Sequence, residues 1–162
     1  MSTHPKNYRR LKGYLLRPKV RAIVFDRDWN VLLCEIPDHV GPNWVLPGGG
    51  IQAQETEEAA LRREVWEETG VSEFKIWGKS AEPTEEIWDD DLKSSCNAQH
   101  DGQLVEEYIV QIQQARPQLH PGDEGEVASG RWVTAQEAKP FLTYKDQYQL
   151  FTQTCLEILG KV

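Results

Sequence analysis

The sequence predicts an α/β fold in which short strands are mixed with three helices. Three features support this: segments rich in β-branched residues between turns, a window of strong helix formers bounded by a cap residue and a glycine, and a C-terminal stretch with apolar residues at helical spacing. The chain has 162 residues, which is enough for one sizeable core, and 39% of them are hydrophobic. This composition is typical of a single globular domain.

The first half of the chain is expected to begin with a β-hairpin. Its β-branched residues predict strands over residues 20–25 and 31–36, joined by a turn at residues 26–30. Pro18 marks the entry of the first strand, because proline is confined to strand edges and starts. Residues 37–43 are expected to form a loop.

A glycine turn is then expected to lead into a helix. Residues 44–46 predict a short strand, and the three glycines at positions 48–50 predict a tight turn with an approachable backbone. Thr56 suits a helix N-cap, and the two glutamates after it suit the positive end of a helix dipole. Gly70 stands where a helix C-cap glycine is expected.

The second half is expected to continue the mixture of strands and helices. Residues 82–103 are polar, acidic and without a clear period, which predicts a long loop or an irregular hairpin. Thr134 and Glu137 form a capping box that predicts a brief helix. The other predicted elements are strands over residues 74–77, 105–112 (interrupted by Glu106-Glu107) and 131–133, and a helix over residues 146–159 with Leu150, Phe151, Cys155 and Ile158 near one stripe.

Charge is distributed unevenly along the chain. Residues 1–21 hold seven basic side chains and no acid, whereas the remainder carries 11 basic and 26 acidic side chains. An acidic body disfavours general adhesion to nucleic acid. We therefore expect a single domain over residues 18–162. The basic leader over residues 1–17 would be either a solvated, flexible terminus or a contact for substrate phosphates, RNA or an acidic neighbouring subunit.

Cysteine usage and hydropathy indicate a cytoplasmic protein. The three cysteines, Cys34, Cys96 and Cys155, are odd in number and lack metal-binding spacing, which favours a reducing compartment. No apolar run is long enough to cross a bilayer, and no apolar signal segment follows the start, so no membrane partner is expected.

The predicted helix carries three carboxylates that would share one face. Glu64, Glu67 and Glu68 are three and four positions apart, and like charges at this spacing repel each other. A hard divalent cation is the simplest partner for such a cluster, and oxygen ligands suit Mg²⁺ or Mn²⁺. The acidic run could also be only a solvated helix face.

The same window resembles the signature of the Nudix hydrolases. The pattern is G, five residues, E, seven residues, R-E, an aliphatic residue, any residue, E-E, any residue, G and an aliphatic residue. The residues that fill every fixed position are Gly49, Glu55, Arg63, Glu64, Val65, Glu67, Glu68, Gly70 and Val71. The resemblance implies an α/β/α sandwich with a mixed β-sheet. It also implies metal-dependent hydrolysis of a nucleoside diphosphate linked to another group.

The resemblance also assigns roles by position. Glu64, Glu67 and Glu68 would bind the metal, with the Gly48 carbonyl as a further ligand, and Arg63 would hold a carboxylate of the helix in place. Glu55 has a less defined role, such as fixing the loop to the helix. Many members of the family take an additional acid, as ligand or base, from a loop outside the motif. The loop candidates here are Glu124 and Glu126, with Glu106 and Glu107 as the alternatives; all four could also be plain surface acids.

The substrate stays open at this point. Trp44 and Trp88 are candidate stacking surfaces for a nucleotide base, although a tryptophan such as Trp44 on a short central strand could equally be core. Nucleoside triphosphates, dinucleoside polyphosphates and ADP-ribose all remain possible substrates of such a protein. The main alternative is a catalytically idle domain that binds or senses a nucleotide, but idle members typically lose motif carboxylates that this chain keeps. The oligomeric state is not predicted.

Overall fold

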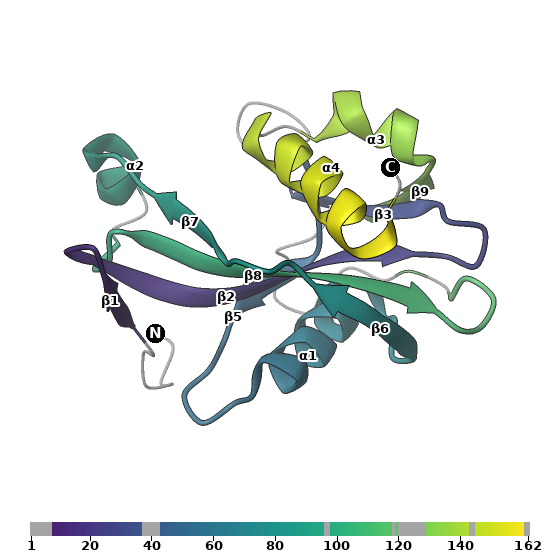
Figure 1. Cartoon of the computed structure of the whole chain (residues 1–162), viewed down its shortest axis with the longest axis horizontal. Coiled ribbons are helices and arrows are strands. Elements are labelled where there is room, and N and C mark those ends of the chain that lie inside the picture. Colours follow the sequence, from purple (N-terminus) through teal and green to yellow (C-terminus); the bar gives the residue numbers. More distant parts are fainter. Residues whose placement is uncertain are drawn as a thin grey trace.

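The computed structural model describes residues 8–36, 43–95, 98–117, 119, 129–142 and 145–160. Within these ranges the strands form one sheet with helices on both faces (Figure 1). The strands are β1 (Arg9–Leu11), β2 (Tyr14–Phe25), β3 (Val31–Ile36), β4 (Asn43–Val45), β5 (Gly48–Gly50), β6 (Phe74–Lys79), β7 (Thr84–Ile87), β8 (Gly102–Ile112) and β9 (Ser129–Val133). The helices are α1 (Glu57–Thr69), α2 (Asp90–Ser95), α3 (Ala135–Phe141) and α4 (Lys145–Leu159).

The sheet is mixed and is organised around two long central strands. Its main order is β4-β3-β2-β8-β6, with β1 and β5 paired to β2, β7 paired to β8, and β9 paired to β3. β2 and β8 run parallel over ten residue pairs, and the other pairings are antiparallel. The α/β class and the mixed sheet are therefore confirmed.

Alternation along β2 separates the two halves of the core. Val20, Ala22 and Val24 face α1 and pack in one cluster with Leu61 and Val65 of that helix. The intervening residues of β2 face the other way, where Ile23 and Phe25 pack in a second cluster with Phe151 and Cys155 of α4. Figure 1 shows α1 below the sheet and α3 and α4 above it.

The helix caps predicted from the sequence are confirmed. The Thr56 side chain accepts a hydrogen bond from the Ala59 N–H at 3.1 Å, and Gly70 adopts the left-handed conformation with a φ of 81°. Thr134 and Glu137 form the reciprocal capping box that starts α3. None of the helices in the described ranges is long and apolar enough to cross a bilayer.

The structure decides three local predictions. Residues 48–50 form strand β5, paired with β2, and not a tight turn. The segment 82–103 is not one long loop; β7 pairs antiparallel with the start of β8, with α2 between them, so the alternative of an irregular hairpin is confirmed. β8 runs without a break through Glu106 and Glu107, because each carboxylate has a cationic partner, Lys79 for Glu106 and Arg21 for Glu107.

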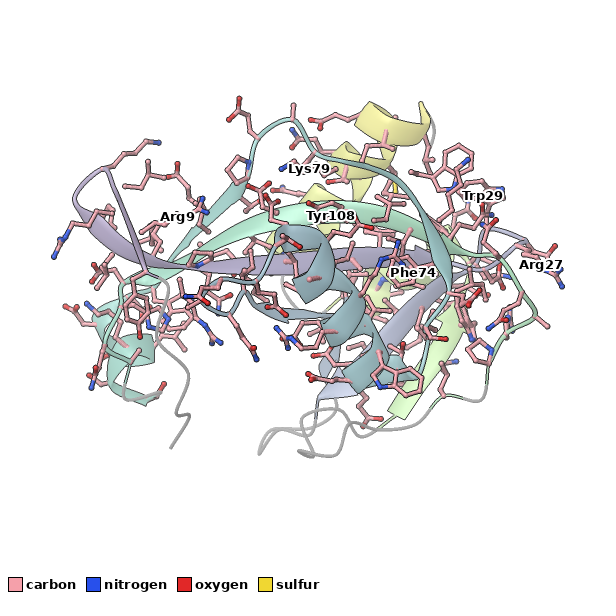
Figure 2. All side chains as sticks on the ribbon, turned by 90° about the horizontal axis from the view of Figure 1, so that it is seen from below. Arg9, Arg27, Trp29, Phe74, Lys79 and Tyr108 are labelled. Atoms are coloured by element: carbon pink, nitrogen blue, oxygen red, sulfur yellow. The ribbon has the colours of Figure 1, made fainter. Side chains whose placement is uncertain are left out.

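The described part of the expected basic leader belongs to the sheet. Residues 9–11 form β1, and residues 14–17 form the first third of β2, which continues through Pro18. The β1–β2 hairpin brings the basic residues of this segment to one end of the molecule, where Figure 2 labels Arg9.

Candidate active site

Side chains of helix α1 form hydrogen bonds with the outer edge of β5, the strand made of three glycines. On its inner side this segment bonds to β2, where the carbonyl of Pro47, just before β5, accepts from the Ala22 N–H at 2.8 Å. On its outer side the Gly48 N–H donates to the Glu68 carboxylate at 3.0 Å, and the Gly50 carbonyl accepts from Arg63 at 3.0 Å. Two side chains of α1, five residues apart, therefore fix the helix against the backbone of β5.

The glycines of β5 are required for this close approach. A Cβ at Gly49 would overlap the Glu64 carboxylate, and a Cβ at Gly48 would overlap the backbone of Val20. Any larger residue would have to displace one of these groups. The first two glycines of β5 are thus explained by the strand and the carboxylate that lie against them.

Arg63 links the carboxylates of the motif to one another. Its guanidinium donates to both oxygens of Glu55, at 2.7 and 2.9 Å, to Glu64 at 2.7 Å, and to Glu67 at 3.3 Å. The hydrogen bonds that its guanidinium donates to Glu55 and Glu64 raise the pKa of Arg63. Because Glu64 is buried, with 8% of its surface exposed, the adjacent positive charge is what makes its ionised form tolerable there.

Glu55 connects the loop after β5 with helix α1 through its hydrogen bonds with Arg63. Its carboxylate also accepts a hydrogen bond from the Gln52 N–H at 2.9 Å. Glu55 therefore ties the loop after β5 to Arg63 on the helix, as the resemblance suggested.

The donors around β5 are of the kind that a hard divalent cation requires. Glu64, Glu67 and Glu68 supply carboxylate oxygens from one helix, and the Gly48 carbonyl lies at the same strand. As arranged in the described ranges, no three acidic, histidine or cysteine side chains converge closely enough to hold an ion. Glu64 is turned to Arg63 and Glu68 to the Gly48 N–H, so binding a cation requires these carboxylates to shift toward it. In donor chemistry the site fits Mg²⁺ or Mn²⁺.

Basic residues of β2 line the opposite face of the sheet beside β5. Arg21 is buried and pairs with Glu107 at 2.8 Å and with Glu86 at 2.6 Å. Burial alone would lower the pKa of Arg21, but these two carboxylates raise it. Lys19 is partly buried, and burial together with the charge of Arg21 lowers the pKa of its amine. Arg17, Lys19 and Arg21 alternate at the period of a strand, which puts them on one face, but their spacing alone does not predict that Arg21 is buried and paired.

The candidate bases fall into two groups. Glu124 and Glu126 lie outside the described residues. Glu106 lies on the α1 side of β8, where its carboxylate is 3.6 Å from the Lys79 amine. Glu107 is buried on the other side in its ion pair with Arg21. Both alternatives on β8 are therefore engaged by cations.

The two candidate stacking tryptophans lie in different parts of the molecule. Trp44 on β4 packs edge-on against Phe141 of α3, with ring centroids 6.3 Å apart, and the Arg131 guanidinium lies 5.6 Å from its ring. Trp88, between β7 and α2, lies 4.8 Å from the ring of His100, which in turn stacks on Tyr8 at 5.2 Å. The structure does not bring these two indoles together.

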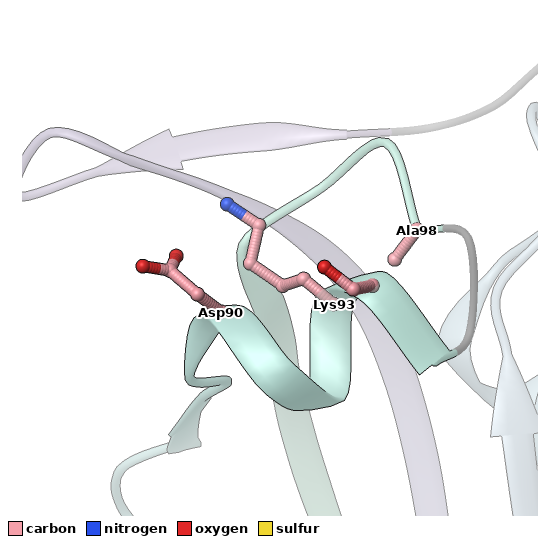
Figure 3. A pocket seen from close by; sticks show the side chains of 4 residues that line it. Asp90, Lys93 and Ala98 are labelled. Atoms are coloured by element: carbon pink, nitrogen blue, oxygen red, sulfur yellow. The ribbon is translucent and has the colours of Figure 1, made fainter.

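A surface hollow of about 390 Å³ lies at α2, lined by Asp90, Lys93, Ser94 and Ala98 (Figure 3). Its lysine is paired with Asp101 at 2.7 Å. None of the candidate site residues that the structure describes lines this hollow, and it is separate from the carboxylates of α1.

Pyrophosphohydrolases are among the known proteins that this chain is similar to. An RNA pyrophosphohydrolase from Caulobacter vibrioides is 38% identical over 65 residues, which cover 40% of this chain and only 38% of that protein. An RNA pyrophosphohydrolase from Cereibacter sphaeroides is 26% identical over 125 residues, which cover 75% of this chain and 77% of that protein. The structure of the E. coli dihydroneopterin triphosphate pyrophosphohydrolase has a TM-score of 0.69 at 15% identity, covering 90% of this chain and 98% of that one. This last likeness shows a shared fold.

The family assignment rests on both the motif and the whole domain. The motif of α1 and β5 has each fixed position filled, and its glycines, arginine and glutamates contact one another in space. The family model of the NUDIX domain matches residues 15–154, which is most of the chain. The protein therefore belongs to the NUDIX domain family.

Proposed function

We propose that this protein is a metal-dependent pyrophosphohydrolase that cleaves a phosphoanhydride in a nucleotide. The proposal rests on the contacts between α1 and β5. Arg63 and Glu68 form hydrogen bonds with the glycine backbone, and the Glu64 carboxylate lies against Gly49. This supports an all-oxygen donor set at one strand edge. A purely structural helix would not need two carboxylates held against a triple glycine.

The residues of the site divide the chemistry between them. When bound, Mg²⁺ or Mn²⁺ would neutralise the diphosphate oxygens and lower the pKa of a water ligand. Glu64, Glu67, Glu68 and the Gly48 carbonyl would hold it. Arg63 keeps Glu64 ionised and oriented and ties Glu55 to the loop, so the donors are positioned before substrate arrives.

We place the general base, or an added ligand, at Glu124 or Glu126. Both precede β9 in a glycine-containing segment of the sequence, at the place where many members of the family take an additional acid. Replacing the base by glutamine is expected to flatten or shift the acidic limb of the pH–rate profile. Glu106→Gln and Glu107→Gln are expected to leave that limb in place, because Lys79 and Arg21 already engage those carboxylates.

Single glutamine variants at all four positions, assayed across pH with saturating metal, test this assignment. Melting curves identify any variant that loses stability rather than chemistry. If Glu106 or Glu107 is the position that changes the pH profile while both loop variants behave as the wild type, the base lies on β8.

The function itself is tested by a substrate screen with product identification. The protein is incubated with Mg²⁺ or Mn²⁺ and a nucleoside triphosphate, a 5′-triphosphorylated RNA, a dinucleoside polyphosphate, ADP-ribose or dihydroneopterin triphosphate. Products are separated by chromatography, and isotope-labelled water shows which phosphorus is attacked. Metal-dependent cleavage of an anhydride is expected, and Glu68→Gln is the inactive reference. Tight nucleotide binding without turnover of any compound would instead identify a nucleotide-sensing domain.

A further inference from the structure

Two cations on β2 lie beside β5, on the face of the sheet opposite α1 and its carboxylates. Arg17 and Lys19 are two residues apart on one strand, so their side chains leave the sheet on the same face. Lys19 pairs in register with Gly50 of β5, and the Arg17 guanidinium lies directly against the Cα of that glycine. A Cβ at Gly50 would overlap this guanidinium, so the third glycine of β5 is the one that admits Arg17.

Neither cation is in contact with a carboxylate of the described residues. Within the part of the chain that the structure describes, the side chains of Arg17 and Lys19 form no hydrogen bond or ion pair. Arg21, two residues further along the same face, contrasts with them, because Glu86 and Glu107 both bind its guanidinium. A partly buried lysine without a carboxylate partner is costly, and an anionic ligand would offset that cost.

The glycines of β5 set these cations next to the carboxylates. Glu68 binds the N–H of Gly48, Glu64 lies against Gly49, and Arg17 lies against Gly50. The negative charge of Glu68 acts to raise the pKa of Lys19, against the effect of burial, so this carboxylate and the amine are close enough to interact. A polyanion bound through a metal at the outer edge of β5 would therefore reach these cations where it extends past that edge to the other face of the sheet.

We propose that Arg17 and Lys19 bind a phosphate group beyond the metal-bound anhydride and so select substrates with three or more consecutive phosphates. This inference rests on the proposed pyrophosphohydrolase function. A guanidinium binds phosphate oxygens through paired, charge-assisted hydrogen bonds, and an ammonium adds a compact positive charge. A substrate whose diphosphate is followed by a sugar offers these two cations no third phosphate.

The first test measures binding without turnover. Calorimetry in the absence of metal ions compares inorganic tripolyphosphate with inorganic pyrophosphate on the wild type, Arg17→Met and Lys19→Met. Wild type is expected to prefer tripolyphosphate, and each variant to weaken its binding by about 10-fold or more, as expected for a lost charged hydrogen bond. Arg27→Met is the matched control, because Arg27 is an exposed arginine just beyond the other end of β2 (Figure 2).

The second test measures selectivity during turnover. With Mg²⁺, the ratio of kcat/KM for ATP to that for ADP-ribose is expected to exceed one in wild type and to fall about 10-fold in Arg17→Met through a higher KM for ATP. Arg17→Lys should recover part of the loss, and Arg27→Met should match wild type.

The two proposals fail in different ways. If no compound is cleaved, the proposed function fails, while the calorimetry still decides whether the cations bind a third phosphate. If wild type cleaves ADP-ribose in preference to ATP, or if Arg17→Met and Lys19→Met bind tripolyphosphate as wild type does, the selectivity proposal is wrong and the hydrolase proposal stands.

Discussion

Arg63 is the residue on which the geometry of the carboxylates depends. It donates to Glu55, Glu64, Glu67 and the Gly50 carbonyl, so one guanidinium compensates charges that would otherwise repel each other. Glu64 is the most buried of these acids and needs this partner most. A lysine could not replace Arg63, because an ammonium cannot present the planar set of donors that reaches these acceptors together.

Glu68 is the residue whose loss should separate catalysis from stability. Glu68→Gln is expected to lower kcat by about 100-fold or more, by analogy with the loss of one preorganised electrostatic group. Folding stability without metal should change little, because the amide oxygen can still accept from the Gly48 N–H and the repulsion within α1 falls. Steady-state kinetics and denaturant unfolding of the same preparations measure the two effects.

The control for this prediction is Glu58→Gln. Glu58 is an exposed acid of the same helix, paired with Arg62 at 3.1 Å and away from β5. It should keep wild-type kcat and stability. A Glu68→Gln protein that is unfolded, or one that keeps near-normal kcat, would contradict the role given to Glu68.

The residues of the site are predictable where spacing alone defines them. The i, i+3, i+4 relation is enough to put Glu64, Glu67 and Glu68 on one face of a helix. The contacts of Arg17 and Lys19 are not predictable in this way, because they depend on the pairing of β2 with β5, about 30 residues further along the chain. A charge run in sequence does not tell which of its members will find carboxylate partners.

Among the elements, β5 shows how tertiary pairing overrides local propensity. Three glycines favour a turn by conformational freedom, but here the edge of β2 offers hydrogen bonds and no side chain obstructs the approach. In the segment 82–103, tertiary contacts likewise decide between the loop and the irregular hairpin that the sequence left open, in favour of the hairpin. The acidic strand β7 is held by Lys12 and Arg21, which bind Glu85 and Glu86 and lie more than 60 residues earlier in the chain.

Strand β5 should be sensitive to a single methyl group. Gly49→Ala places a Cβ where the Glu64 carboxylate lies, so the carboxylate must move. Both kcat and the free energy of unfolding are expected to fall, the latter by about 1–3 kcal/mol, the usual cost of overpacking. A double-mutant cycle with Glu64→Ala separates this contact from other effects of the alanine.

In the Glu64→Ala background the carboxylate is absent, so Gly49→Ala should cost clearly less free energy than it does in wild type. Equal costs in the two backgrounds would show that the alanine acts through the backbone of β5 and not through Glu64. Urea unfolding of the four proteins gives the coupling directly.

At the scale of the whole molecule, the two faces of the sheet differ in chemistry. The even-numbered residues of β2 pack against α1 in an apolar cluster. The odd-numbered residues include the charged Lys19 and Arg21 in the first part of the strand, and they pack against α4 in its last part. The parallel pairing of β2 with β8 joins residues 86 positions apart. The fold class could be predicted because the motif implies it. The pairing of β2 with β8 could not, because no short stretch of sequence indicates which distant strand another strand will pair with.

The whole molecule should also respond to metal through its stability. The acidic cluster of α1 binds an ion only when folded, so Mg²⁺ or Mn²⁺ should raise the free energy of unfolding by about 2.7 kcal/mol at 100 times its dissociation constant. Melting temperature should rise with metal concentration in wild type and much less in Glu68→Gln, while NaCl of matched ionic strength controls for screening. EDTA should abolish turnover, and added metal should restore it. Full activity in chelator, or equal stabilisation of Glu68→Gln by metal, would remove the basis for a catalytic metal at β5.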